Sequence, residues 1–392
     1  MATNWPVLVA VTVLSSLGLL SILARSHAEA RYSADARKQV IFIIIGACCM
    51  FLVQAVSYLR IGRYAWGFYI LSLLLLIYTI VPGMPSGFLG VVEANYSRAW
   101  INLGFVNLQP AELTKVAFCM VLSRYLRFRS NYRTLGGLLP PFALAILPVF
   151  LILRQPDLGT ALVFIPALFA MLFVAGAKTK HLLAIIGMAA VLAPVVWLAG
   201  PKEKTGLSYD LPLLRHLPVL IKAYQRNRVY AMFSNDPAVL RKTAFQQDLA
   251  VTAFGSGGVA GRGAMQVPVG RTVPEAHNDM IFALVGEQFG FIGAAVLLAA
   301  YLVLAVTGIE IASATREPFG RLLAVGIVSL LAGQTFLNLM VSVKLMPVTG
   351  ITLPFVSYGG SSLMASFIAV GLLLNIGQNR PLVMAKDPFE FD

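Results

Sequence analysis

Val273-Pro-Glu-Ala-His-Asn-Asp-Met280 places three titratable side chains, Glu275, His277 and Asp279, directly before an apolar segment that runs from Ile281 to Val303. A segment of this length predicts a membrane-spanning helix, and a carboxyl group at its mouth would be only partly hydrated. Ionisable groups in such places are costly and usually serve a function. We therefore expect this stretch to be the centre of the fold and of the functional site.

The composition indicates a polytopic membrane protein. Of the 392 residues, 58% are hydrophobic and 12% are charged, and the mean hydropathy is +0.80, which excludes a soluble globular domain of this length. The first apolar segment, residues 6–24, is too long for the core of a cleaved signal peptide, so we expect it to be retained. The net charge of +13 suits membrane lipids with anionic headgroups or an anionic lipid-linked substrate, whereas nucleic acid is a poor partner for such a chain.

Ten segments are long and apolar enough to cross a hydrocarbon core of about 30 Å. We therefore predict an all-α polytopic membrane protein, one domain over residues 1–392, with ten transmembrane helices and one large extracytoplasmic loop, residues 200–278, between helices 7 and 8. The predicted helices lie at residues 6–24, 40–59, 64–82, 109–126, 138–153, 158–176, 182–200, 280–305, 321–343 and 361–378.

An even number of spans places both termini on one side of the membrane. The short loops on that side carry most of the arginine and lysine residues, which predicts cytoplasmic termini. The first loop argues against this orientation, because it carries the basic residues Arg25, Arg31, Arg37 and Lys38.

The loop 200–278 then faces outward. Its first half is basic, with Lys222, Arg226 and Arg228 around Tyr224, and its second half contains Arg262 within the glycine-rich residues 255–263. We expect these two halves to form a cationic platform beside Asp279.

Glu275 and Asp279 are four residues apart, so a helix would place both carboxylates on one face. Paired carboxylates serve as acid and base when their surroundings separate their pKa values. The alternative is structural, with Glu275 capping the helix and Asp279 in its first turn. His277 could titrate near neutral pH or bind a phosphate, or it could belong to an ordinary loop-to-helix transition.

Three further charged residues lie within or beside predicted spans. Glu112 and Lys115 are three residues apart in a helix opened by Gln109-Pro110. Because a buried ion pair adds little stability, this pair indicates a polar cavity. Asp157, between two spans, lines the same cavity or caps a helix.

The sequence Pro347-Val-Thr-Gly-Ile-Thr-Leu-Pro-Phe-Val-Ser-Tyr-Gly-Gly-Ser-Ser362 interrupts the apolar pattern near the C-terminus. Irregular backbone at membrane depth is tolerated where protein or a water-filled cavity surrounds it. We expect Ser357, Gly359 and Gly360 to line the cavity. The chain has no phosphate-binding P-loop, zinc-ligand spacing or Gly-x-Ser-x-Gly motif, so neither nucleotide-driven transport nor serine hydrolysis is supported.

These motifs, in this order, resemble the SEDS family of cell-wall polymerases, whose members include RodA, FtsW and SpoVE. The resemblance covers nearly the whole chain and leans toward RodA, given the short N-terminus and Pro347-Val-Thr-Gly350. Four positions depart from the family pattern, namely Ala99, Asn278, Gln288 and Lys344. The matching segments are 97–101, 109–115, 155–161, 224–228, 255–263, 274–279 and 347–362.

The resemblance implies polymerisation of lipid II, an undecaprenyl-diphosphate-linked disaccharide pentapeptide, at the outer face of the bacterial cytoplasmic membrane. It implies that Asp279 is the family's essential aspartate and that a class B penicillin-binding protein is a partner. It requires no cofactor, although a divalent cation could assist. We expect Arg98, Lys115 and Arg262 to offset the charge of the leaving diphosphate, with Glu112, Asp157, Glu275 and His277 nearby. A lipid II flippase and a structural scaffold remain the alternative functions.

Overall fold

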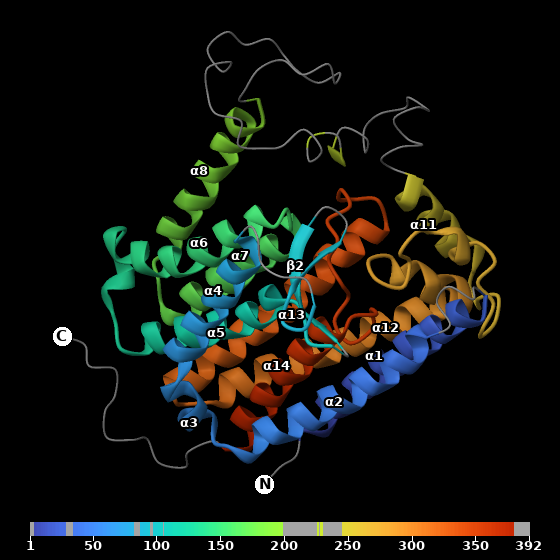
Figure 1. Ribbon diagram of the computed structural model, residues 1–392. Coiled ribbons are helices and arrows are strands. Elements are labelled where there is room, and N and C mark those ends of the chain that lie inside the picture. The colour runs from blue at the N-terminus through green and yellow to red at the C-terminus, as the bar shows by residue number, and fades with distance from the viewer. Residues whose placement is uncertain are drawn as a thin grey trace.

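The computed structural model describes residues 4–28, 34–81, 87–94, 97–104, 106–198, 226, 228–229 and 245–379. Within these ranges most of the chain is helical (Figure 1). The longer helices are α1 (Trp5–Ala28), α2 (Asp35–Ala55), α4 (Ala65–Ile80), α5 (Pro110–Arg127), α6 (Leu139–Arg154), α7 (Leu158–Ala175), α8 (Thr179–Leu198), α11 (Phe245–Ser256), α12 (Ile281–Ala314), α13 (Pro318–Ser342) and α14 (Gly360–Gln378). Short helical turns are α3 (Tyr58–Arg63), η2 (Asn131–Arg133), η3 (Gly136–Leu138) and η5 (Gly270–Thr272).

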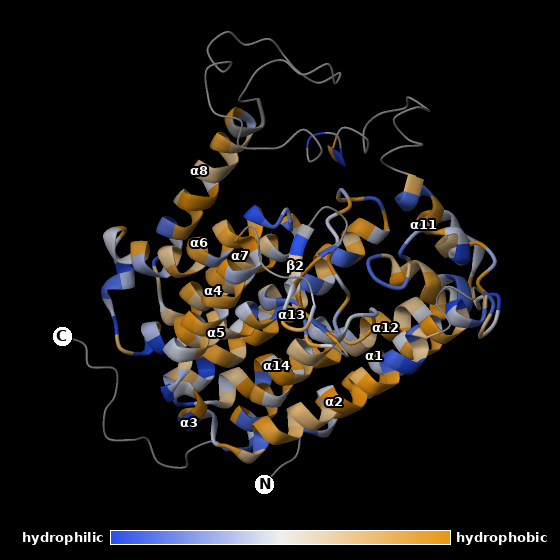
Figure 2. Ribbon diagram, viewed as in Figure 1, coloured by the Kyte–Doolittle hydropathy of each residue, from blue (hydrophilic) through white to orange (hydrophobic). Residues whose placement is uncertain are grey.

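Each of the ten predicted spans coincides with a helix, from α1 to α14. Among the described residues, seven helices are long and apolar enough to cross a membrane, and α4 and α8 are shorter apolar helices. The tenth, α5, carries Glu112 and Lys115 on an otherwise span-length helix. The prediction of a helical multi-pass membrane protein is confirmed, while the count of ten spans stays a prediction. Hydrophobic residues cover the helices, and hydrophilic residues gather mainly on the connecting segments (Figure 2).

The core of the bundle is built around α14, which is almost entirely buried. It packs along α2, while α13 packs against α7, α5 and α12, and α1 lies along α12. Because α14 and α13 are enclosed by other helices, the loop that joins them is held between several elements. That loop covers residues 343–359 and so contains most of the 347–362 segment identified in the sequence.

A small sheet, absent from the sequence prediction, lies between α4 and α5. Its strands β1 (Val91–Ala94), β2 (Ser97–Asn102) and β3 (Asn107–Leu108) are antiparallel in the order β1-β2-β3. Ile101 of β2 is paired with Val91 on one side and Leu108 on the other. The strands are two to six residues long and lie in the polar gap between two spans, where hydropathy carries little signal.

Helix α12 is broken at Gly290, whereas the sequence predicted one continuous span. Gly290 has φ 63° and ψ −159°, a conformation that strongly favours glycine. Residues 258–263 satisfy the backbone groups released by the break. The Phe291 N–H donates to the Gly258 carbonyl at 2.9 Å, and the Gly263 N–H donates to the Gln288 carbonyl at 3.0 Å. The glycine-rich residues 258–263 are thus anchored on α12.

Candidate active site

Two segments far apart in sequence meet where α12 and α14 begin. The Tyr358 N–H donates to the His277 carbonyl at 2.8 Å, and the Ser357 hydroxyl donates to the Asn278 carbonyl at 2.5 Å. From α2, the Gln39 side-chain amide donates to the Ser357 carbonyl at 3.2 Å. The 273–280 segment and the 347–362 segment therefore form one wall, as the sequence analysis expected.

Asp279 is partly exposed on this wall. Enough protein surrounds its carboxyl group that desolvation raises its pKa to about 7, with smaller raising contributions from Glu275 and Asp157. The charge of Arg228 acts in the opposite direction. Among the described residues, the Asp279 carboxylate has no hydrogen-bond partner, so it is available to a ligand. A carboxyl group that titrates near neutral pH can take up a proton during a reaction.

The backbone of Asp279 is firmly held. Its carbonyl accepts a hydrogen bond from the side-chain amide of Asn338 at 2.9 Å, and the same amide donates to the Ile351 carbonyl at 2.7 Å. Gly350 has φ 77°, and a Cβ atom built there would lie 3.8 Å from Asp279 Oδ2. Asn338 of α13 thus links the 273–280 segment to the 347–362 segment directly behind the carboxylate.

Glu275 and Asp279 are near each other for a different reason from the one predicted. Helix α12 begins at Ile281, after a Met280 cap that has no side-chain bond, so the two carboxylates do not share a helical face and Glu275 does not cap the helix. Instead they lie in a turn in which the Asp279 N–H donates to the Glu275 carbonyl at 3.3 Å. Glu275 has φ 49°, and its carboxylate accepts from the Asn278 amide at 2.8 Å.

His277 is buried, with 4% of its surface exposed. Its Nε2 lies 3.7 Å from Asp35 Oδ2 and 3.8 Å from Glu275 Oε2. Desolvation, followed by the charge of Arg25, lowers the pKa of His277 to about 3, so the ring is neutral at physiological pH. Of the interpretations left open by the sequence, this geometry favours the structural one over titration near neutral pH.

Lys115 and Glu112 form the expected pair inside α5. Their side chains are almost fully buried and lie 3.0 Å apart. The Lys115 ammonium also donates to Gln334 at 2.7 Å, and the Gln334 amide donates to the Thr352 carbonyl at 2.9 Å. This chain of polar groups connects α5 through α13 to the 347–362 segment.

Asp157 caps helix α7, as the structural alternative proposed. Its carboxylate accepts from the Thr160 N–H at 2.9 Å, from the Thr160 hydroxyl at 2.7 Å and from the Gln109 amide at 3.2 Å. Desolvation nevertheless raises the pKa of Asp157, and its charge in turn raises that of Asp279. The residue is therefore a cap that also belongs electrostatically to the site.

Arg98 and Arg262, two of the cations predicted to bind the diphosphate, lie on different elements of the structure. Arg98 is partly exposed on β2, and the sheet is joined to α14 because the Ser361 hydroxyl donates to the Asn107 carbonyl at 2.8 Å. Gly360, which begins α14, packs closely there, since a Cβ would lie 2.9 Å from Val106. Arg262 is exposed and donates to the Ser256 hydroxyl at 3.1 Å, and no hydrogen bond or ion pair within the described ranges joins it to the 273–280 segment.

Three residues that contact the site, Arg228, Gln334 and Asn338, were not predicted as site residues from the sequence. Arg228 belonged to the predicted platform but not to the site, and its guanidinium donates to the Val348 carbonyl at 2.7 Å. Lys222 and Tyr224 of that platform lie outside the described residues. Gln334 and Asn338 are four residues apart in α13, so they lie on one face of an apolar helix. This spacing of polar residues is the feature of the sequence that could have indicated their role in the site.

Two of the departures from the family pattern also form contacts. The Asn278 amide bonds to Glu275, and Lys344 forms an ion pair with Asp248 of α11 at 2.5 Å. Asp248 is next to Gln247, whose buried amide donates to the Val341 and Met346 carbonyls at 2.9 and 2.7 Å. These contacts attach α11 to the end of α13.

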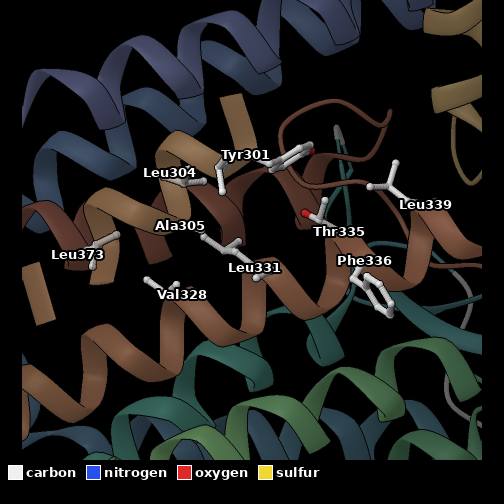
Figure 3. Close-up of a pocket in the computed structure, with 11 residues that line it drawn as sticks. Tyr301, Leu304, Ala305, Val328, Leu331, Thr335, Phe336, Leu339 and Leu373 are labelled. Carbon is white, nitrogen blue, oxygen red and sulfur yellow. The ribbon is translucent and has the colours of Figure 1, made fainter. Parts of the chain in front are cut away.

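An apolar cavity lies between α12 and α13 (Figure 3). Tyr301 and Thr335 provide its hydroxyl groups, and the Tyr301 hydroxyl donates to the Pro354 carbonyl at 2.5 Å. The cavity has no charged lining residue and includes none of the predicted site residues.

Among the described residues, no group of three or more His, Cys, Asp or Glu side chains is arranged to hold a metal ion.

Comparison with known proteins shows the family to which the chain belongs. A family described as cell cycle proteins, comprising FtsW, RodA and SpoVE, matches residues 4–381. The chain belongs to this family. The resemblance stated from the sequence motifs is thereby confirmed.

Members of the FtsW, RodA and SpoVE family align with most of the chain. Stage V sporulation protein E of Bacillus subtilis (strain 168) is 34% identical over 380 residues, which are 95% of this chain and 96% of that protein. A probable peptidoglycan glycosyltransferase FtsW of Geobacter metallireducens is 34% identical over 350 residues, 87% of this chain and 84% of that protein.

Solved structures of the family share the fold. A chain from a peptidoglycan synthase complex, described as coordinating polymerization and crosslinking, has a TM-score of 0.78 and 30% identity, over 98% of this chain and 100% of that chain. Rod shape determining protein RodA of Thermus thermophilus has a TM-score of 0.68 and 28% identity, over 97% and 98% of the two chains. Relatives named FtsW, SpoVE and RodA all match, so the leaning toward RodA stays a prediction.

Proposed function

We propose that this chain, a peptidoglycan glycosyltransferase of cell-wall synthesis, polymerises lipid II with Asp279 as the general base. The observation that carries the proposal is the Asp279 carboxyl group. It is partly exposed, has no hydrogen-bond partner in the described part of the chain and has a pKa raised to about 7. The names of the relatives support the substrate class. The FtsW relative, which aligns with this chain over 84% of its own length, is named a probable peptidoglycan glycosyltransferase.

The proposed reaction is an inverting glycosyl transfer. An acceptor sugar hydroxyl of one lipid II attacks the anomeric carbon of the growing chain, and a new carbon–oxygen bond forms. The bond from that carbon to the diphosphate breaks, and its electron pair leaves with undecaprenyl diphosphate. Asp279 takes the proton of the attacking hydroxyl. General base catalysis of this kind contributes about 10²- to 10⁴-fold in rate.

The leaving diphosphate requires positive charge, and such electrostatic stabilisation is commonly the largest catalytic contribution. Arg228 is well placed, because its charge acts on Asp279 and its guanidinium is bonded to Val348. Arg98, Lys115 and Arg262 remain proposed substrate contacts. Lys115 is already paired with Glu112 and Gln334, so we assign it mainly to the shape and charge of the wall.

The other residues of the wall are proposed as substrate-binding by position. Asp157 and Glu275 adjust the charge around Asp279, and Ser357 joins the two segments. A divalent cation, if bound, would supply further positive charge for the leaving diphosphate, but among the described residues no group of three or more His, Cys, Asp or Glu side chains is arranged to hold one. The wall also contains His277, Gly359 and Gly360.

We further propose that the site faces the outside of the bacterial cytoplasmic membrane and that both termini are cytoplasmic. Arg25 was one of the basic residues that argued against this orientation. It is only 2% exposed and acts on His277, so it belongs to the interior of the site and does not mark a membrane face. The solved complex that coordinates polymerization and crosslinking supports a penicillin-binding protein of class B as the partner.

The deciding experiment is polymerisation of purified lipid II by the detergent-solubilised full chain with its class B partner, in wild type and Asp279→Asn. Long strands from the wild type and none from a folded variant are expected. Equal products from both would refute the general base. Products from neither, with a competent partner, would favour the flippase, and normal cell growth with Asp279→Asn would favour a scaffold.

A further inference from the structure

The beginning of the second span reaches the segment that carries Asp279. Asp35 is the first residue of α2, and its side chain is 16% exposed. It faces His277, which is two residues before Asp279, with 3.7 Å between Asp35 Oδ2 and His277 Nε2. This distance is too long for a hydrogen bond, so the carboxylate limits the position of the neutral ring by contact and charge.

Tyr358 completes the connection from the other side. The charge of the Asp35 carboxylate acts on its hydroxyl, its ring lies 5.4 Å from the His277 ring between centroids, and its N–H donates to the His277 carbonyl at 2.8 Å. Burial, with the nearby charge of Asp35, raises the pKa of Tyr358 to about 12, so the hydroxyl keeps its proton throughout the physiological range. Asp35, His277 and Tyr358 therefore form one contact group from three elements, which we call the brace.

The position of Asp279 depends on such support because its own carboxylate has no hydrogen-bond partner in the described part of the chain. Asn338 holds its carbonyl, and Ser357 holds the preceding carbonyl of Asn278. The next residue back is His277, where the brace acts. A misplacement of about 1 Å in a reacting group can cost about 10²-fold in rate, so support of the backbone beside Asp279 bears directly on catalysis.

We propose that Asp35, through Tyr358 and His277, is a positioning residue for Asp279, so that the N-terminus of the second span sets the geometry of the catalytic carboxylate. The inference rests on the proposed function of Asp279. Within the described residues no hydrogen bond or ion pair joins Asp35 to Asp279, so Asp35 acts through the residues that hold the backbone. The charged and titratable groups around it are Arg25, Lys38, Glu275, His277 and Tyr358.

A simpler role for Asp35 is to place a negative charge at the N-terminus of α2, where the helix dipole favours it. That role predicts lower thermal stability and an unchanged turnover number in the folded protein. It also predicts no special relationship between Asp35 and Tyr358. The brace predicts both a lower turnover number and a coupling between these two side chains.

The test uses the full chain with its class B partner and measures kcat and apparent KM for lipid II, together with thermal unfolding in detergent. The variants are Asp35→Ala, Tyr358→Phe and the double variant, and Glu310→Ala on an exposed part of α12 is the matched acid control. Tyr358→Phe keeps the ring and the backbone bond and removes only the hydroxyl that meets Asp35.

We expect about a tenfold lower kcat for Asp35→Ala, a smaller loss for Tyr358→Phe and an apparent KM within about twofold of wild type. The double variant should fall no further than Asp35→Ala, because residues that act as a unit are non-additive. Glu310→Ala should match wild type. If Asp35→Ala does not fold, the kcat of Tyr358→Phe decides the question.

Unchanged kcat in the folded brace variants, or losses that simply multiply in the double variant, would overturn the brace alone. The proposed function has its own control in the same assay, because wild type must polymerise and Asp279→Asn must not. A wild type without polymerisation, or an active Asp279→Asn, would overturn the general base and the brace with it.

Discussion

The pH dependence of polymerisation is the sharpest consequence of the Asp279 environment. An ordinary aspartate, with a pKa of 3.8, is fully ionised from pH 6 to pH 8, whereas desolvation raises the pKa of Asp279 to about 7. Only about one tenth of the carboxyl groups would then be ionised at pH 6 and about nine tenths at pH 8. A general base must be ionised to accept a proton, so kcat/KM should rise roughly tenfold across this interval.

Two substitutions should move this profile in opposite directions. The charge of Glu275 raises the pKa of Asp279, so Glu275→Gln should move the acid limb to lower pH. The charge of Arg228 lowers that pKa, so Arg228→Gln should move the limb to higher pH. General damage to the site would not produce shifts of opposite sign. Glu310→Gln, at an exposed acid on α12, is the control that should leave the limb in place.

The assay is the initial rate of lipid II polymerisation from about pH 5.5 to 8.5, with the class B partner present and the substrate below saturation, so that the profile reports the free enzyme. Protein stability is measured at each pH, because the raised pKa of Asp279 also makes the free energy of unfolding depend on pH. The folded state favours the protonated carboxyl, so this contribution to stability is present at low pH and is lost as the pH rises through about 7. A flat profile over the whole range in stable protein would refute the assignment of Asp279 as a desolvated base.

Three other predictions follow from the same wall. Lys115→Met should destabilise the protein by about 3–5 kcal/mol in a denaturation measurement, because it leaves the buried Glu112 carboxylate unpaired. Adding Glu112→Gln should restore most of this loss, and equal stability of the single and double variants would contradict the pairing. Gly350→Ala should lower the free energy of unfolding by roughly 1–2 kcal/mol, because Gly350 has a φ of 77°, and it should lower kcat, because the 347–362 segment lies against Asp279. A melting temperature and a kcat equal to those of the wild type would show that the turn tolerates a side chain. His277 has a pKa lowered to about 3, so the stability that depends on the neutral ring is present above its ordinary value of 6.5 and lost as the pH falls toward 3; an unfolding midpoint no more acid-sensitive than that of His277→Gln would contradict this.

Much of the fold followed from the sequence because hydrophobicity in a membrane protein is a local property. A segment of about twenty apolar residues must cross the bilayer or lie in a core whatever its neighbours are, and each predicted span coincides with a helix. Short features were less predictable. The β1-β2-β3 sheet and the break of α12 at Gly290 depend on hydrogen bonds to other segments, such as that from Phe291 to Gly258.

For the site as well, contacts within one helix or turn were predicted better than contacts between distant segments. The pairing of Glu112 with Lys115 and the cap at Asp157 follow from spacing within one helix or turn, and the structure contains both. The proximity of Glu275 to Asp279 was expected for the wrong reason, because a turn and not a helix joins them. Arg262 was expected beside Asp279, yet the described contacts tie it to Ser256.

By itself, the sequence determined that this chain is a helical multi-pass membrane protein of the SEDS type with Asp279 at the mouth of a span, because composition, length of apolar segments and motif order are properties of the chain alone. Only the tertiary structure decided what surrounds that carboxylate. Asn338, Arg228 and the Asp35 brace reach the 273–280 segment from three other parts of the chain. A pKa and a side-chain position depend on everything within a few ångströms, and those neighbours are brought together by packing between helices rather than by distance along the sequence.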